Sequence, residues 1–285
     1  MPLAIRKYDI VEDTHSKHIA GLSRLSILIG MDSFSYIVCD NLLRIQVFRM
    51  YSLPIGADNT PDWQAFFIDV SASDELLTLV YKEVCIGFAQ PLFSLVPEAW
   101  YRPGDKRSYL EHLTNLLPNA IIGEDSIPSI QAKNVYFIPT PLQNWVQFRR
   151  TNPILRHFVS AILPAIRGTL VADQNVVAYL FLEQLFVFYF LEGKLVFANS
   201  FKCATAKDVL YYVLLVFDQF KLSQDSCPLW LGGVISPETD IYKQLYKYIH
   251  NVQLLPPNPG FNPGPKISQL PTSFYFGLTA QLGMV

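Results

Sequence analysis

A pattern of three consecutive strands that occurs twice is the feature that most constrains this chain. Segments rich in Ile, Val, Leu, Phe and Tyr alternate with short polar stretches that are typical of hairpin turns. The predicted strands span residues 25–30, 34–39 and 42–53 in the first copy and residues 175–182, 185–191 and 194–202 in the second. The turns Asp40-Asn41 and Glu192-Gly193 hold equivalent places and lie about 150 residues apart, roughly half of the chain. We therefore expect two similar halves, each opening with an antiparallel meander.

After each meander the sequence alternates between helical and strand patterns. The predicted helices span residues 108–117, 154–166, 204–220 and 237–249, and a further helix begins at Pro139-Thr140-Pro141. The predicted strands span residues 81–88, 90–96, 134–138, 228–231 and 252–255. Residues 272–282 are predicted to form a final helix or strand. Asn152 is suited to cap the helix that begins at Pro153. This order predicts a first domain over residues 1–151 and a second over residues 152–285.

Two segments are expected to lie outside this framework. Residues 1–20 are polar and of mixed charge, and we expect a peripheral lead-in. Residues 256–265 hold five Pro and two Gly, which predicts an exposed extended loop that joins no sheet and is dispensable for folding.

Composition favours a buried core over a membrane or a disordered chain. Hydrophobic residues make up 51% of the sequence and charged residues 16%, which excludes disorder as the main state. The mean hydropathy is +0.23, but the longest apolar stretch, residues 176–191, is interrupted by Glu183 and Gln184. It is too short and too polar to span a bilayer, and the N-terminus has no apolar segment typical of a secretory signal. We expect a cytoplasmic protein without a membrane span.

Charge and motifs exclude several kinds of chemistry. The net charge of −2 argues against nucleic-acid binding. The four cysteines are far apart in sequence, so no zinc or redox pair is indicated. The sequence has no Walker phosphate loop, no dinucleotide-binding glycine motif, no nucleophile elbow and no HExxH motif. No metal site and no catalytic residue are expected.

Three strands followed by alternating helix and strand is the order of a ribonuclease-H-like unit, and the resemblance extends to a family. The residues that carry it are the hairpin at 29–36, the meander at 175–202 and the segment 229–233, Leu-Trp-Leu-Gly-Gly. On these the chain resembles an uncharacterised Bacteroidetes family, domain of unknown function 3822, and the pilus and secretion-platform branch of the actin-like ATPase superfamily. The resemblance implies the mixed α/β class, with two ribonuclease-H-like domains in tandem and a ligand cleft between them.

The resemblance also implies where a nucleotide would bind. Active members place a phosphate loop, Asp-x-Gly, in the first hairpin of each domain. Here the first hairpin reads Gly30-Met31-Asp32-Ser33, so Asp32 follows the glycine, and a turn with local Asp and Ser hydrogen bonds explains it as well. The second hairpin carries Glu183-Gln184 without a glycine. Gly232-Gly233 matches the place where the family packs an adenosine, although a strand-to-helix turn also accounts for it.

The sequence is compatible with two functions. The first is a non-catalytic actin-like scaffold that binds an unidentified protein partner and needs no cofactor. The second is a divergent ATP-dependent phosphotransferase or ATPase that uses ATP and magnesium in the cleft. Its cofactor-binding residues would be Asp32, Ser33, Glu183, Gly232 and Gly233. The departures from both phosphate loops favour the scaffold.

Overall fold

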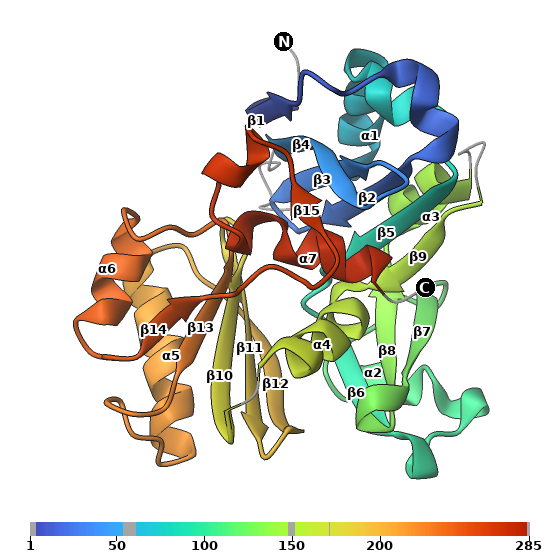
Figure 1. Cartoon of the computed structure of the whole chain (residues 1–285). Coiled ribbons are helices and arrows are strands. Elements are labelled where there is room, and N and C mark those ends of the chain that lie inside the picture. The colour runs from blue at the N-terminus through green and yellow to red at the C-terminus, as the bar shows by residue number, and fades with distance from the viewer. Residues whose placement is uncertain (1–3, 54–60, 148–151, 171, 284–285) are drawn as a thin grey trace.

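The computed structural model of the chain describes residues 4–53, 61–147, 152–170 and 172–283. Its first sheet contains the first meander, with β2 (Arg24–Ile29), β3 (Ser33–Cys39) and β4 (Arg44–Ser52) paired in antiparallel order. On the other side of β2, β5 (Glu83–Phe88) and then β9 (Ile154–His157) follow in parallel. The order β4-β3-β2-β5-β9 runs from β4 to the edge strand β9 (Figure 1).

The second sheet repeats the same order. Its meander consists of β10 (Gln174–Leu180), β11 (Gln184–Leu191) and β12 (Lys194–Lys202), and β13 (Leu229–Gly233) and β14 (Val252–Leu254) follow in parallel. The order β12-β11-β10-β13-β14 matches the first sheet strand for strand. The duplication predicted from the spacing of the turns is therefore confirmed.

Helices cover the sheets in corresponding places. α1 (Trp63–Ser73) connects β4 to β5, as α5 (Ala206–Gln219) connects β12 to β13, and α6 (Asp240–Tyr246) connects β13 to β14. Thr205 and Asp208 form a capping box at the start of α5, which satisfies two backbone N–H groups of its first turn. The buried residues of α5 pack on one face of the second sheet.

Two helices lie between the sheets and join the halves. α4 (Phe158–Thr169) contacts α7 (Ser273–Leu282), and α7 also packs against β2, β5 and β13 (Figure 1). Every residue of α7 is buried, as expected of a helix that is enclosed on all sides. The Ser26 hydroxyl donates a hydrogen bond to the carbonyl of Leu278 at 2.7 Å. One hydrophobic core therefore extends through both halves.

A third, smaller sheet is inserted between β5 and β9. It has the order β6-β8-β7, with β6 (Phe93–Pro97), β7 (Ile121–Ile127) and β8 (Ala132–Ile138). α2 (Ser108–Glu111) precedes β7, and α3 (Thr140–Gln147) follows β8. Short 3₁₀ helices lie at Lys17–Leu22, Glu75–Thr78, Glu98–Trp100, Pro103–Asp105, Pro128–Ile130 and Ile267–Gln269.

The expected helix at 154–166 is wrong at its start. Residues Ile154–His157 form β9, because they pair with β5, and the helix begins at Phe158. Its N-cap is His157, whose Nδ1 accepts from the backbone of Val159, and not Asn152. The domain boundary at 151/152 stays a prediction; Arg150 and Thr151 lie outside the described residues. The pairing of β9 favours a later boundary, between α4 and β10.

The expectations for the two peripheral segments are wrong on one point, since both segments join the first sheet. The expectation that residues 256–265 are dispensable for folding stays a prediction. Residues Ile5–Val11 form β1, which pairs with β4 at the edge of the first sheet. Residues Asn262–Pro263 form β15, which also pairs with β4. The N–H groups of Asn262 and Gly264 donate to the carbonyls of Leu43 and Ile45. The proline between them falls at the position whose N–H is not needed, which is how a strand edge tolerates proline.

Two predicted helices are shorter than their apolar spacing indicates. The segment predicted at 108–117 is helical only over α2, and Leu113 and Leu117 are exposed, so their spacing marks no buried face. α6 begins at Asp240 because the Thr239 side chain caps it. Within the described residues, no helix is long and apolar enough to cross a membrane.

Candidate functional site

The two hairpins that the resemblance assigns to phosphate binding lie against each other. The carboxylate of Asp32 accepts hydrogen bonds from the backbone N–H of Leu182, at 3.3 Å, and from that of Glu183. Asp32 is only 6% exposed. These bonds cross 150 and 151 residues, so the expectation of a turn residue with purely local hydrogen bonds is wrong.

Gly30 is explained by this close packing. A Cβ atom at Gly30 would lie 2.7 Å from Cδ1 of Phe181 and 2.8 Å from the Ser33 hydroxyl. Phe181 in turn packs edge-to-face on Phe158 and Phe186. The glycine of the first hairpin therefore makes room for an aromatic ring of the second half.

Burial and hydrogen bonding act on Asp32 in opposite directions. Burial raises the pKa of this carboxyl, whereas hydrogen bonds from the Glu183 backbone, the Ser33 side chain and the Leu182 backbone oppose the rise. The net pKa lies above the ordinary value. Backbone N–H groups in a turn are the donors that bind phosphate in other proteins. Here the chain's own carboxylate already occupies two of them.

A cavity of about 300 Å³ remains beside this contact. Its lining residues are Met31, Asp32, Pro61, Pro91, Glu183, Gln184, Ser200 and Lys202. Its described lining therefore includes two acidic residues and one lysine, and the exposed Lys202 is the cation that sequence reasoning missed. It stands at the end of β12 outside any motif, so only the folded hairpins bring it here. The cavity is at the lower end of the size range of ligand sites.

Gly232 and Gly233 serve the packing of β13 and do not line this cavity. Gly233 has a φ of +87°, and a Cβ atom there would lie 1.8 Å from the carbonyl oxygen of Leu180. A Cβ atom at Gly232 would lie 2.5 Å from Cδ2 of Tyr179. Both glycines are buried. The structure thus brings Asp32, Ser33 and Glu183 together and leaves Gly232 and Gly233 in the sheet.

The described residues offer little that could act as a nucleophile or bind a metal ion. The four cysteines are free and buried, and burial raises the pKa of the Cys227 thiol to about 11 and that of Cys203 to about 12. Thiols of this kind stay protonated and unreactive. No group of three or more His, Cys, Asp or Glu side chains that could hold a metal ion occurs in that part of the chain.

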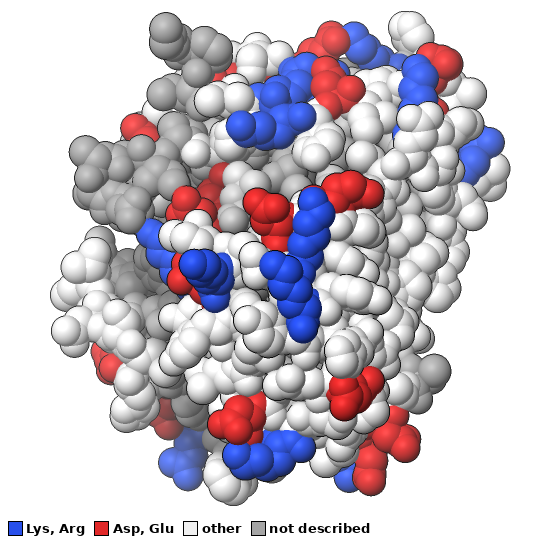
Figure 2. Space-filling view, turned by 90° about the vertical axis from the view of Figure 1, so that its left-hand side faces the viewer, with Lys and Arg blue, Asp and Glu red and all other residues white. Residues whose placement is uncertain are grey.

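The face of the molecule in Figure 2 gives little sign of a polyanion partner. Figure 2 shows one face of the molecule, on which Lys, Arg, Asp and Glu lie in small mixed groups separated by wide uncharged areas. An extended basic patch is the footprint of nucleic-acid binding, and the described residues of this face present none.

Comparisons with known proteins agree with the duplicated fold. A family model described as "Protein of unknown function (DUF3822)" matches residues 12–252. A solved structure from Bacteroides thetaiotaomicron, described as a protein with actin-like ATPase fold and unknown function, superposes with a TM-score of 0.71 at 20% identity. It covers 87% of this chain and 96% of its own. The PilM-PilN type IV pilus biogenesis complex matches with a TM-score of 0.58 at 12% identity, over 92% of this chain and 98% of that one.

No curated protein matches the sequence significantly. At these identities the solved structures show the fold alone. The expected class, a mixed α/β protein of actin-like ATPase architecture with tandem ribonuclease-H-like units, is confirmed.

Proposed function

This chain belongs to the family described as "Protein of unknown function (DUF3822)", and we propose that it is a non-catalytic actin-like scaffold that binds other proteins and has lost its nucleotide site. The observation that carries this proposal is the contact of Asp32 with the backbone of Leu182 and Glu183. In that contact an internal carboxylate takes the place that a bound phosphate would need.

The electrostatics of the cavity support the same proposal. ATP would bring its phosphates next to Asp32 and Glu183, with Lys202 as the one cation among the described lining residues. Phosphoryl transfer depends on backbone donors and metal ions that stabilise the charge of the phosphates. Bringing like charges together without such groups is unfavourable.

A role in protein binding is supported by likeness of fold. The PilM-PilN structure contains the same architecture in a complex of pilus biogenesis. The alternative is a divergent ATP-dependent phosphotransferase or ATPase that binds at Asp32, Ser33, Glu183, Gly232 and Gly233. The crowding at both glycines weighs against it, because both are buried and even a Cβ atom there would meet Tyr179 or the Leu180 backbone.

Calorimetric titration with ATP and magnesium, followed by a phosphate-release assay, tests the proposal. We expect affinity no better than about millimolar, near −4 kcal/mol, and no turnover. Micromolar binding with turnover that Asp32→Ala abolishes would establish the enzyme instead. Glu183→Gln is the matched control, because it removes a charge and leaves the backbone N–H that donates to Asp32 in place.

A further inference from the structure

Two sheet edges face each other across an open groove. β12 is the edge strand of the second sheet, and β6 is the edge strand of the third. Between them lie two adjoining cavities of about 650 and 670 Å³, which share Leu95 of β6 and Leu195 of β12. We call their combined space the edge groove. One cavity is lined by Gly193–Leu195 and the other by Leu195–Ser200, so the groove follows β12 for about 25 Å.

The groove runs along the edge of β12 and not over one of its faces. Consecutive residues of a strand point to opposite faces of the sheet. Six consecutive residues, Leu195–Ser200, line the second cavity, so side chains of both faces border it. Such a space is open to the backbone of the edge strand.

The pairing of β12 indicates which backbone groups face the groove. Cys203 donates its N–H to the carbonyl of Glu183 at 2.7 Å. Bonded and non-bonded pairs alternate in an antiparallel ladder, so Ala198 and Ser200 direct their backbone groups away from β11. Ser200 donates its N–H to the Asn199 side chain at 2.8 Å. Within the described residues, Ala198 has no hydrogen-bond partner on this side.

β6 offers the same arrangement from the opposite wall. Glu98 donates its N–H to Gln131 at 2.8 Å, and alternation from this pair turns the backbone of Leu95 away from β8. These backbone groups are ones that an added strand would satisfy.

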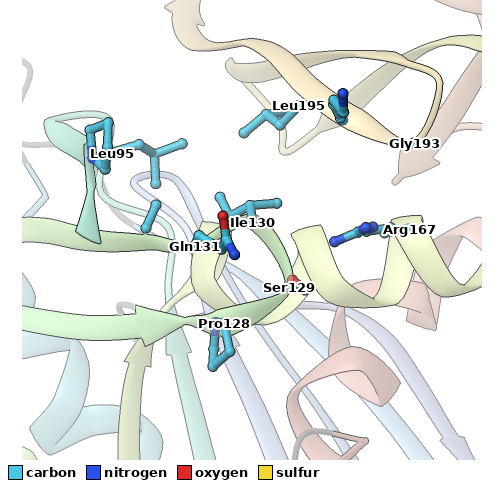
Figure 3. A pocket seen from close by; sticks show the side chains of 11 residues that line it. Leu95, Pro128, Ser129, Ile130, Gln131, Arg167, Gly193 and Leu195 are labelled. Atoms are coloured by element: carbon cyan, nitrogen blue, oxygen red, sulfur yellow. The ribbon is translucent and has the colours of Figure 1, made fainter. Parts of the chain in front are cut away.

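The two ends of the groove differ. At one end, the Ser200 hydroxyl donates a hydrogen bond to the carbonyl of Pro91 at 2.8 Å and closes it. At the other, Arg167 of α4 and Lys194 of β12 line the opening, and both are exposed. Figure 3 shows Arg167 extending from its helix toward Gln131, with Leu95 and Leu195 on the two walls. Among the described residues that line the two cavities, none carries a carboxylate.

The lining of the two cavities is about half apolar, and some of its apolar side chains are exposed. Val196 is 46% exposed and Leu113 is 56% exposed. A long edge strand with apolar residues is a site of strand addition that proteins normally protect with charges or a cover. β12 carries lysines only at its first and last residues, with a bulge near Val196.

We propose that the edge groove binds an extended segment of a partner protein, which adds a strand to β12 and places a carboxylate near Arg167 and Lys194. Backbone hydrogen bonds supply affinity in this mode of recognition, and alternate side chains supply selectivity. The segment carries apolar residues at alternate positions and an acidic residue at the end next to the cations. This inference rests on the proposed function in one respect, namely that the protein acts by binding other proteins.

The experiment begins with a displayed library of linear 12-residue peptides, panned on the full chain. We expect enriched peptides with alternating apolar residues and at least one Asp or Glu. A synthetic peptide of the enriched sequence is then titrated against Arg167→Glu and Lys194→Glu, and each variant is expected to bind at least about 10-fold more weakly. Lys207→Glu on α5, an exposed lysine away from the groove, makes the same change of charge and should bind like the wild type.

Hydrogen exchange provides the readout that is specific for an added strand. The amide of Ala198 should become protected on peptide binding, while amides on the exposed face of α5 should not. Equal binding by Arg167→Glu and Lys207→Glu, protection elsewhere, or no enrichment of any peptide would each overturn the proposal. A melting temperature within about 2 °C of wild type confirms that each variant is folded.

The outcome is separable from that of the ATP test. Turnover of ATP together with peptide binding in the groove would end the scaffold proposal and leave this one standing. Absence of both would end this inference alone.

Discussion

Asp32 is one carboxylate that holds the two halves of the chain together. It accepts from backbone groups 150 and 151 residues away and is almost fully buried. A buried N–H that loses its acceptor costs about 1–3 kcal/mol, because it has already left water. The cost of replacing Asp32 therefore comes from the N–H groups of the second half that lose their acceptor.

We predict that Asp32→Ala lowers the free energy of unfolding by about 2–4 kcal/mol, and Asp32→Asn by about 1–3 kcal/mol. An amide keeps one acceptor but turns a donor toward an N–H group. Denaturant unfolding measures both values. Glu183→Gln should change stability by less than about 0.5 kcal/mol, and a loss equal to that of Asp32→Asn would show that side-chain charge matters more than the backbone contact.

His157 is a second residue whose role depends on the fold. It is fully buried, its Nε2 lies 2.8 Å from the carbonyl oxygen of Gln90, and its Nδ1 accepts from Val159 at 3.1 Å. This pattern fixes a neutral ring with the proton on Nε2. Burial lowers the pKa to about 3, although the bond to Gln90 acts in the opposite direction.

We predict a loss of stability on acidification that depends on His157. Between pH 6.5 and about 3 the unfolded chain binds a proton at this ring and the folded chain does not. The free energy of unfolding therefore falls with decreasing pH by up to about 1.4 kcal/mol per unit in this window, and this group contributes no slope above pH 7. Denaturant unfolding of the wild type and His157→Asn from pH 7 to pH 5 measures the difference. Parallel curves in that range would contradict the assignment.

At the scale of elements, β13 shows why its two glycines are needed. Parallel pairing sets Gly232 opposite Tyr179 and Gly233 opposite Leu180. A side chain on either glycine would meet atoms of β10. Gly193, in the turn between β11 and β12, also has a positive φ, of +70°, but nothing lies within 4 Å of its would-be Cβ. The same residue type therefore meets different demands in a turn and in a sheet.

We predict that Gly233→Ala costs more than about 4 kcal/mol and strongly reduces the yield of folded protein, because it combines backbone strain with a collision. Gly193→Ala should cost about 1–2 kcal/mol, from the left-handed conformation alone. Thermal unfolding compares the two. Similar costs for both variants would mean that β13 shifts to accept a side chain.

At the scale of the whole molecule, the proline-rich segment ties the halves together. It leaves Leu255 near the second sheet and reaches β4 of the first sheet through β15. On the way, the Asn258 side chain donates to the carbonyl of Phe276 at 2.9 Å and to the Thr279 hydroxyl at 2.7 Å, and Phe261 is buried. Glu12 accepts from the backbone of Lys266. α7 then enters the space between the two sheets.

We predict that a Gly-Ser linker in place of residues 257–265 lowers stability by about 3–6 kcal/mol, since it removes a buried aromatic ring and buried hydrogen bonds. For a chain of this size the melting temperature should fall by about 10 °C or more. Asn258→Ala should reproduce part of the loss, whereas Asn262→Ala, at an exposed side chain, should have little effect. An unchanged melting temperature would restore the view of this segment as a dispensable connector.

Local sequence was sufficient for the elements whose stability comes from neighbouring residues. The two meanders, the helix at α5 and the duplication followed from apolar runs, turn residues and spacing along the chain. The pairing of residues in a hairpin involves segments a few positions apart, so the pattern that forms it is visible in the sequence.

Tertiary structure decided the features that depend on partners far along the chain. β1, β9 and β15 are strands because they pair with β4 and β5, and their own residues show no pattern that predicts a strand. Asp32 lies in a turn sequence, yet its carboxylate oxygens accept hydrogen bonds from backbone N–H groups of the other half. Gly233 has to be a glycine because the carbonyl oxygen of Leu180, 53 positions earlier, lies where a Cβ atom would be. Which hydrogen bonds a buried carboxylate makes, and which edges stay open, is set by how the halves pack. The sequence by itself therefore determined two similar sheets, and only their packing determined that Asp32 of one half accepts from the backbone of the other.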